Sequence, residues 1–149
     1  FVAVKGSMIV IGTFYIQSGE VNIESILAGI VIGTLSSLVL FIASFPDHDA
    51  DKSKGRKTLV ITVGKEKARK LFWFFPLFAY GVIVIGVVLN HLPVFTLISL
   101  MSFPLIIKSG IGLQKNYDSV ENLVPYMSST LKFSRLTGIL FVISFLIPL

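Results

Sequence analysis

Residues 24–46 read ESILAGIVIGTLSSLVLFIASFP, an apolar run with no charge after Glu24. A helix that crosses a bilayer needs about 20 apolar residues, because each residue advances the axis by only about 1.5 Å. Hydrocarbon offers no hydrogen bonds to the backbone, so such a segment must fold as a helix. We therefore predict a transmembrane helix over 24–46 that kinks or ends at Pro46, which has no backbone N–H.

The rest of the chain repeats this apolar pattern. Hydrophobic residues make up 54% of its 149 residues and charged residues only 14%, whereas soluble domains carry about 25% charged residues. Further apolar segments lie at 1–18, 71–90, 93–113 and 131–149. The sequence thus predicts an all-α fold, a polytopic bundle of five transmembrane helices. Because the chain starts with Phe1 and shows no signal-peptide pattern, we expect it to be the C-terminal part of a longer protein.

The lysines and arginines are confined to one side of the predicted five-helix zigzag. The turns at 18–22 and 90–93 contain none, whereas the connection between the second and third helices carries eight. We expect the others to lie at the same side, near the start of the first helix or flanking the connection between the fourth and fifth: Lys5, Lys108, Lys115, Lys132 and Arg135.

Cytoplasmic loops of membrane proteins are enriched in Lys and Arg. We therefore predict a multi-pass protein of the cell membrane whose connection at about 47–66 lies on the cytoplasmic side. The basic residues of 65–70 are expected to contact the anionic lipids of that leaflet. The net charge of +5 is explained by this arrangement and does not indicate binding of nucleic acid.

Small residues inside the helices predict close contacts between helices. Gly29 and Gly33 are four residues apart, so they lie on one face and let another backbone approach. We interpret Gly81 and Gly86 in the same way.

An acidic cluster meets a basic cluster in residues 45–64, FPDHDADKSKGRKTLVITVG. Asp47 and Asp51 are four residues apart, so on a helix they share one face. A calcium-binding EF-hand loop is excluded, because Lys52 occupies the position of its glycine and Thr58 that of its terminal Glu. Two interpretations remain: a solvated loop whose acids neutralise nearby lysines, or a Mg²⁺ site where carboxylates and basic residues hold a diphosphate with an apolar tail.

The order of residues in this stretch resembles the second aspartate-rich motif of the UbiA family of intramembrane prenyltransferases. The matching positions are Asp47, Asp51, Gly55, Thr58, Leu59 and Gly64. The words FPDHDADK and GRKTL are similar to the branch that contains the 1,4-dihydroxy-2-naphthoate prenyltransferases. The stretch GTFYIQSG at 12–19 resembles the GTYYVQTG signature of that branch, and a weaker match leads from Leu123-Val124-Pro125 to Thr130.

The resemblance implies a fold of nine transmembrane helices with two aspartate-rich motifs facing a central cavity. Residues 1–149 would then be helices five to nine of a single transmembrane domain. The first motif would lie in the N-terminal remainder of the same protein, so this fragment alone is expected to be inactive. Ala43 stands where the family often has Asn, so a polar contact near the metal is expected to be missing.

The chemistry that the resemblance implies is Mg²⁺-dependent transfer of a prenyl group from a polyprenyl diphosphate to an aromatic acceptor. In the naphthoate branch that acceptor is 1,4-dihydroxy-2-naphthoate, a precursor of menaquinone. Asp47 and Asp51 would be the catalytic carboxylates and the Mg²⁺ ligands. Asp49 points to a different helical face and is expected to be solvated or to reach the metal only through other groups. The diphosphate would be held by basic residues, foremost Arg56 and Lys57 and then Lys52 and Lys54.

Other functions remain open from the sequence. A UbiA-type enzyme with another acceptor would use 4-hydroxybenzoate, homogentisate or a glycerol-lipid precursor. A transporter would use the aspartates as a cation site and would carry ionisable groups at the membrane midplane. A third class is a non-catalytic membrane scaffold, for which Ala43 is the only hint. A zinc site is not indicated, because His48 and His91 are isolated and the chain has no cysteine.

Overall fold

The computed structural model describes residues 6–147, and every regular element in that range is a helix. In chain order they are α1 (Met8–Ser18), α2 (Ile23–Ala43), α3 (His48–Ser53), α4 (Leu59–Val63), α5 (Lys65–Leu71), α6 (Phe74–Val88), the 3₁₀ helix η2 (Val94–Ser102), α7 (Phe103–Asn116) and α8 (Val120–Ser144). The predicted all-α membrane bundle is confirmed.

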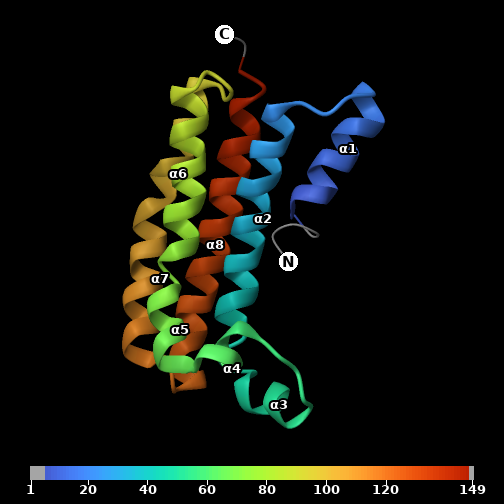
Figure 1. Ribbon diagram of the computed structural model, residues 1–149. Helices are drawn as coiled ribbons and strands as arrows, with labels where there is room; N and C mark the ends of the chain where they lie inside the picture. The colour runs from blue at the N-terminus through green and yellow to red at the C-terminus, as the bar shows by residue number, and fades with distance from the viewer. Residues whose placement is uncertain (1–5, 148–149) are drawn as a thin grey trace.

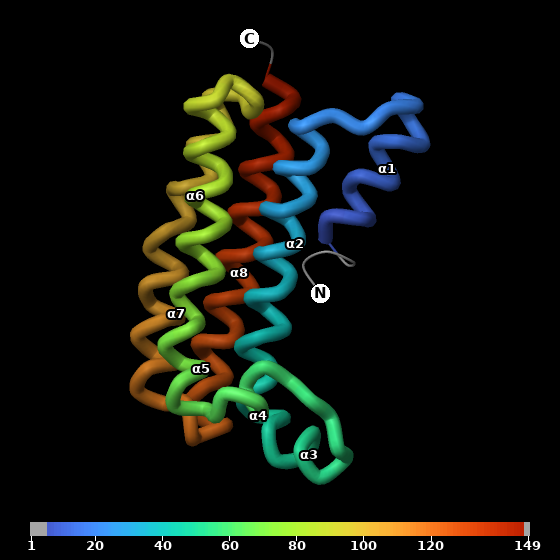
Figure 2. The backbone as a smooth tube through the Cα atoms, in the orientation of Figure 1, coloured from blue at the N-terminus to red at the C-terminus, as the bar shows by residue number. Residues whose placement is uncertain are grey.

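Four long helical stretches lie side by side and alternate in direction (Figures 1 and 2). They are α2, α5 with α6, η2 with α7, and α8, which packs against α2, η2 and α7. α1 packs against α2 and stands apart on one side of the bundle. The short helices α3 and α4 lie where α2 ends and α5 begins, and we call this end of the bundle the α3 end.

Three stretches of the described residues are long and apolar enough to span a membrane: Ile23–Ala43, Lys65–Val88 and Val94–Asn116. They correspond to the segments predicted at 24–46, 71–90 and 93–113. α1 is a shorter apolar helix. The start of the helix predicted over 1–18, with Lys5, and the last residues of the one predicted over 131–149 lie outside the described residues.

The fifth predicted helix begins at Val120 rather than near residue 131. Its first turns mix polar and apolar residues, so they do not form the continuous apolar run on which the prediction was based. The helix also continues through Pro125. As a result, Lys132 and Arg135 lie in the middle of α8. The prediction that these two residues flank the connection between the fourth and fifth helices is wrong.

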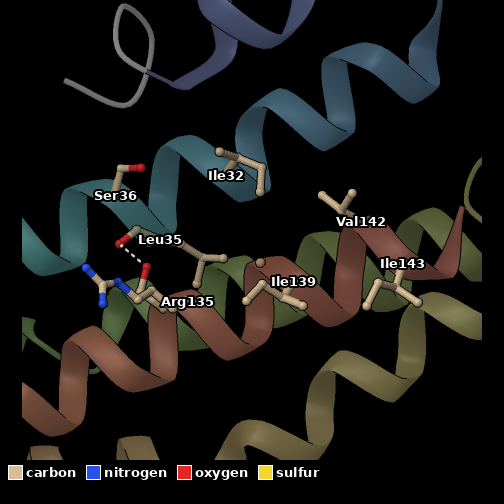
Figure 3. Close-up of a pocket in the computed structure, with 9 residues that line it drawn as sticks. Ile32, Leu35, Ser36, Arg135, Ile139, Val142 and Ile143 are labelled. Atoms are coloured by element: carbon tan, nitrogen blue, oxygen red, sulfur yellow. Dashed lines mark hydrogen bonds between the residues drawn. The ribbon is translucent and has the colours of Figure 1, made fainter.

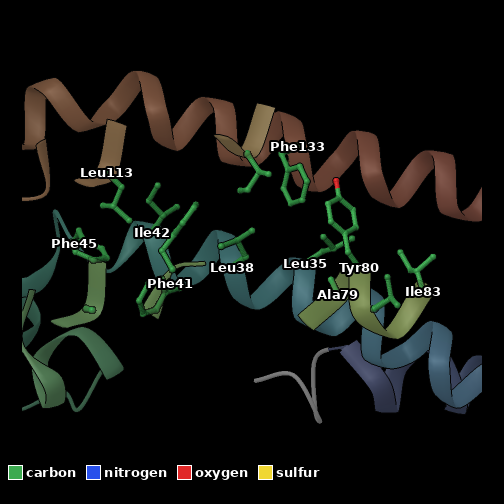
Figure 4. Close-up of a cluster of buried hydrophobic side chains, with 14 of the residues drawn as sticks. Leu35, Leu38, Phe41, Ile42, Phe45, Ala79, Tyr80, Ile83, Leu113 and Phe133 are labelled. Carbon is green, nitrogen blue, oxygen red and sulfur yellow. The ribbon is translucent and has the colours of Figure 1, made fainter. Parts of the chain in front are cut away.

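The core joins α2, α6, α7 and α8 along the length of the bundle (Figure 4). Its buried side chains come from all four helices and include Leu35, Leu38, Phe41, Ile42, Ala79, Ile83, Ile106, Leu113, Phe133 and Phe141. Because these side chains touch across the bundle rather than facing outward, they fix how α2 and α8 lie against each other.

Hydroxyl groups link the helices inside this core. Tyr80 Oη lies 2.8 Å from Ser102 Oγ, which lies 2.6 Å from Thr137 Oγ1. In η2 the buried residues Thr96, Ser99 and Ser102 recur every three residues, the period of a 3₁₀ helix, so they lie on one side. Hydrogen bonds of this kind between membrane helices stabilise by about 0.6 kcal/mol each on average.

Glycines allow α1 to cross close to α2. A Cβ added to Gly29 would lie 2.8 Å from the Cα of Ser7, and one added to Gly6 would collide with the backbone of Gly33. The close packing predicted for Gly29 and Gly33 is therefore found here. Gly86 packs against the Leu92 side chain, whereas a Cβ on Gly81 would meet no described atom within 4 Å, so the contact predicted there is wrong.

Candidate functional site

The aspartate cluster begins where α2 stops. α2 ends at Ala43, and Pro46 stands three residues later in a turn before α3. Phe45 is 1% exposed and packs edge-on against the ring of Phe41, with ring centroids 5.6 Å apart. This buried ring fixes the turn to the bundle, so Asp47 is presented directly at the α3 end.

Asp47 and Asp51 lie one helical turn apart. The amide N–H of Asp51 donates a 2.8 Å hydrogen bond to the carbonyl of Asp47, the residue that precedes α3. The side chain of Asp51 is 13% exposed, and Asp47 is exposed. Two carboxylates on successive turns of one helix can approach a single cation from the same side.

Arg56 closes the loop that follows α3 onto Asp51. Its Nη1 donates a 2.9 Å hydrogen bond to Asp51 Oδ1, and its backbone N–H donates to the carbonyl of the same residue, also at 2.9 Å. Gly55 permits this reversal because its φ of +69° lies in the left-handed region, which other residues rarely adopt. The loop therefore brings a candidate metal ligand and a candidate diphosphate ligand into direct contact.

Asp49 differs from the other two aspartates in exposure and partner. Its side chain is 86% exposed, and His48 Nδ1 lies 2.7 Å from its Oδ1. The hydrogen bond from His48, followed by the positive charge of Lys65, lowers the pKa of Asp49 below its ordinary value. Asp49 therefore stays ionised as a solvated partner of His48 and does not lie on the same face of the helix as Asp47 and Asp51.

The other predicted basic ligands surround this cluster as solvent-facing side chains. Lys52, Lys54 and Lys57 are exposed. Thr58 ends the loop, because its Oγ1 accepts a 3.2 Å hydrogen bond from the amide of Ile61 and caps α4. These exposed lysines thus form a positively charged rim beside two carboxylates, an arrangement suited to a ligand with several anionic oxygens.

The donor set fits a magnesium ion that the substrate helps to hold. Within residues 6–147 no group of three or more His, Asp or Glu side chains is arranged to bind a metal. Mg²⁺ needs only one or two protein carboxylates when phosphate oxygens and water complete its shell. Asp47 and Asp51 meet that smaller requirement. Ala43, one turn before Asp47, is half-buried and offers no polar atom in its side chain.

Arg69 has a role that the sequence did not indicate. We expected it to contact lipid, but its side chain is 24% exposed and joins α5 to α7. Its Nη1 donates to the carbonyl of Gln114 at 2.9 Å, and Gln114 Nε2 donates to the carbonyl of Arg69 at 2.6 Å. The guanidinium also lies 4.4 Å from the ring centre of Tyr117. A basic residue in a basic run gives no signal for such a contact, because the partner is distant in sequence.

Residues 1–146 match the sequence pattern of the UbiA prenyltransferase family, which covers the helices, the aspartate cluster and the loop described above. The chain belongs to the UbiA prenyltransferase family. The family assignment made from the aspartate motif is therefore confirmed.

Two curated members of similar sequence carry the same name. The 1,4-dihydroxy-2-naphthoate octaprenyltransferase of Escherichia coli (strain K12) is 28% identical over 141 residues, 93% of this chain and 44% of the relative. The protein of that name from Bacillus subtilis (strain 168) is 30% identical over 142 residues, 95% of this chain and 45% of the relative. This UbiA-family chain thus spans less than half the length of the relatives it matches.

A shorter match links the chain to a plant enzyme. Coumarin 8-geranyltransferase 1, chloroplastic, from Citrus limon is 37% identical over 60 residues, 40% of this chain and 15% of the relative. No solved structure matches this chain.

Proposed function

We propose that this chain is part of a membrane enzyme that transfers a prenyl group from a polyprenyl diphosphate to an aromatic acceptor. The observation that carries the proposal is the pair Asp47 and Asp51, one helical turn apart at the start of α3, with Asp51 bonded to Arg56, at the end of an apolar bundle of this family. This arrangement suits a ligand with an anionic head and an apolar tail. The head would lie beside the carboxylates and basic residues, and the tail along the bundle.

In this proposal Asp47 and Asp51 hold Mg²⁺, which supplies positive charge against the diphosphate leaving group. Arg56 and Lys57 bind the remaining diphosphate oxygens, and Lys52 and Lys54 add charge at the rim. The pairing of Asp51 with Arg56 keeps both groups in place before substrate binds. Asp49 stays outside this contact, as its exposure and its bond to His48 suggest.

The proposed reaction breaks the C–O bond between the prenyl group and the diphosphate, and the electron pair leaves with the diphosphate. A carbon of the acceptor ring then forms the new C–C bond to the allylic carbon. Where that ring carbon bears a carboxylate, loss of CO₂ returns an electron pair to the ring and restores its aromaticity. The residues at the α3 end bind and orient the anionic leaving group throughout.

The acceptor that we propose is 1,4-dihydroxy-2-naphthoate, on the path to menaquinone. Two relatives that cover over nine-tenths of this chain are named for that acceptor, which supports the choice. Another acceptor, 4-hydroxybenzoate, homogentisate or a glycerol-lipid precursor, is the alternative. We place the protein in the cell membrane with the α3 end in the cytoplasm, since the basic loop lies at that end.

The remainder of the protein is proposed to complete the site. The chain carries one aspartate motif and covers 44–45% of the naphthoate-enzyme relatives. We therefore expect the 149-residue chain to be inactive by itself. Mg²⁺-dependent turnover by this isolated chain would show that the remainder is not needed.

The test is prenyl transfer in membranes that contain the full-length protein, with labelled polyprenyl diphosphate, 1,4-dihydroxy-2-naphthoate and Mg²⁺ or a chelator. We expect Asp51→Ala to lower kcat by about 100-fold or more, because a carboxylate that stabilises the leaving group is lost. Asp118→Ala is the matched control, since Asp118 is an exposed acid in the connection between α7 and α8. Unchanged transfer by Asp51→Ala would refute the metal site, and no turnover of any quinone precursor would favour a scaffold.

A further inference from the structure

Arg135 is a charged residue at the depth of the bundle's middle. Its neighbour Ser134 donates a 3.2 Å hydrogen bond to the carbonyl of Leu35, which lies near the centre of the membrane-spanning stretch Ile23–Ala43. Arg135 is exposed and makes no hydrogen bond or ion pair with any residue between 6 and 147. A charge inside a membrane is unfavourable unless it has a partner, so such a residue marks a functional site by default.

Arg135 lines a groove between α2 and α8 (Figure 3). The groove has a volume of about 430 Å³, and its other lining side chains are mainly aliphatic, among them Ile32, Leu35, Ile139 and Val142. In Figure 3 the Arg135 side chain extends along the groove toward the end of α2 that leads to the aspartates. The guanidinium therefore lies at the end of the groove nearer the α3 end, with the aliphatic lining on its other side.

A larger cavity continues the groove away from the α3 end. It has a volume of about 1010 Å³, and it shares the lining residues Ile32 and Val142 with the groove. Aromatic side chains line it from two sides, Phe14 on α1 and Phe141 on α8. The two spaces together form a mainly apolar path along α2 and α8, with Arg135 in the groove and the pair of His91 and Glu24, whose Nδ1 and Oε1 lie 3.7 Å apart, in the larger cavity.

We propose that Arg135 binds the carboxylate of an aromatic-acid acceptor whose ring lies in the α2–α8 groove. This inference rests on the proposed prenyl transfer and names the residue that selects its acceptor. A guanidinium pairs with a carboxylate through two parallel hydrogen bonds, and the pair is strengthened in an apolar surrounding. The carboxylate of the ligand thus pairs with Arg135, and its ring packs against the aliphatic side chains of the groove.

The spacing along α2 suits this placement. Leu35 lies eight residues before the end of α2 at Ala43, a rise of about 12 Å. Arg135 reaches from the level of Leu35 toward that end. A ring in the groove would therefore direct its carboxylate toward the aspartates and leave space between Arg135 and the aspartates for the allylic carbon. The diphosphate already has basic residues at the rim, so the anion that requires a deeper cation is the one on the acceptor.

The test compares Michaelis constants in the full-length protein. Arg135→Gln is expected to raise the KM for 1,4-dihydroxy-2-naphthoate by about tenfold or more, with the KM for polyprenyl diphosphate unchanged, because a charge-assisted pair is lost. Arg135→Lys keeps the charge and should recover part of the affinity. Lys132→Gln is the matched control, because Lys132 is an exposed cation one turn away on α8 that does not line the groove.

Binding measurements keep the inference independent of catalysis. Equilibrium binding of labelled 1,4-dihydroxy-2-naphthoate should weaken in Arg135→Gln, whereas binding of 1,4-naphthalenediol, which lacks the carboxylate, should not change. Equal binding of the acid by the wild type and Arg135→Gln would overturn the proposal, as would a rise in the diphosphate KM alone. If the wild type transfers no prenyl group, the proposed function fails, while the binding comparison still decides the role of Arg135.

Discussion

The guanidinium of Arg56 donates a 2.9 Å hydrogen bond to Oδ1 of Asp51, five residues earlier in the chain. These are the residues that we assign to the diphosphate and to Mg²⁺, respectively. Their side chains differ in exposure, 67% for Arg56 and 13% for Asp51. Binding of a metal diphosphate would therefore exchange their mutual contact for two new ones, with Asp51 on the cation and Arg56 on the anion.

Replacement of Arg56 tests diphosphate binding separately from Mg²⁺ binding by Asp51. We expect Arg56→Gln to raise the KM for polyprenyl diphosphate by about tenfold, because one charge-assisted contact is lost. The concentration of Mg²⁺ that gives half-maximal binding without substrate should stay the same or fall, because Asp51 loses a competing cation. Steady-state kinetics and calorimetric Mg²⁺ titration measure the two effects. Lys67→Gln, an exposed charge on α5, serves as control, and equal KM values for both variants would contradict the assignment.

Asp49 provides a pH-dependent prediction at the same site. Its pKa is lowered in the fold by the His48 hydrogen bond and then by Lys65. A folded-state pKa below the unfolded one stabilises the fold at pH values above the unfolded pKa, and this contribution is lost as the pH falls through the folded pKa. Its size is small, because Asp49 is fully exposed to solvent.

His48→Gln should therefore raise the pKa of Asp49 toward its ordinary value, which ¹³C NMR of the labelled carboxyl group measures. The wild-type protein should show the lower titration midpoint, and prenyl transfer at neutral pH should be little affected. An Asp49 midpoint that is the same in both proteins would show that His48 is not the cause.

Residue spacing in the sequence was enough to predict which aspartates share a helical face, but not which side chains contact each other at the site. Asp47 and Asp51 are four residues apart, and helical periodicity alone predicts that they share a face. The pairing of Asp51 with Arg56 depends instead on the left-handed backbone at Gly55, whose effect on side-chain positions is not visible in the sequence. The same holds for Arg69, since its partner Gln114 lies 45 residues away.

Helix boundaries were predictable only where apolar residues are continuous. The stretch at 24–46 met that condition, and α2 covers most of it. The start of α8 did not, because its first turns mix polar and apolar residues. This is why Arg135 was expected near a loop and lies in the middle of a helix instead.

The close approach of the chain before α1 to α2 predicts that Gly29→Ala lowers stability, whereas Gly81→Ala, on α6, should not. Gly29→Ala places a methyl group 2.8 Å from the Cα of Ser7, so the helices must separate, at a cost of about 1–3 kcal/mol. Gly81→Ala meets no described atom within 4 Å and should be neutral or stabilise by up to about 1 kcal/mol through helix propensity. Thermal unfolding in detergent compares the two, and equal melting temperatures would exclude a tight contact at Gly29.

Arg69 is predicted to hold α5 in place and, through it, the loop that carries the basic residues. Arg69→Gln removes the bond to the carbonyl of Gln114 and the contact with Tyr117, which should lower stability by about 1–3 kcal/mol. Lys70→Gln is the control, because it also removes one positive charge but at an exposed neighbouring residue, and it should leave stability unchanged. Limited proteolysis provides a second measurement, because a loosened α5 exposes the loop at 52–58 to cleavage. If Arg69→Gln and Lys70→Gln melt and cleave alike, Arg69 acts only as a surface charge and the α5–α7 contact does not position the loop.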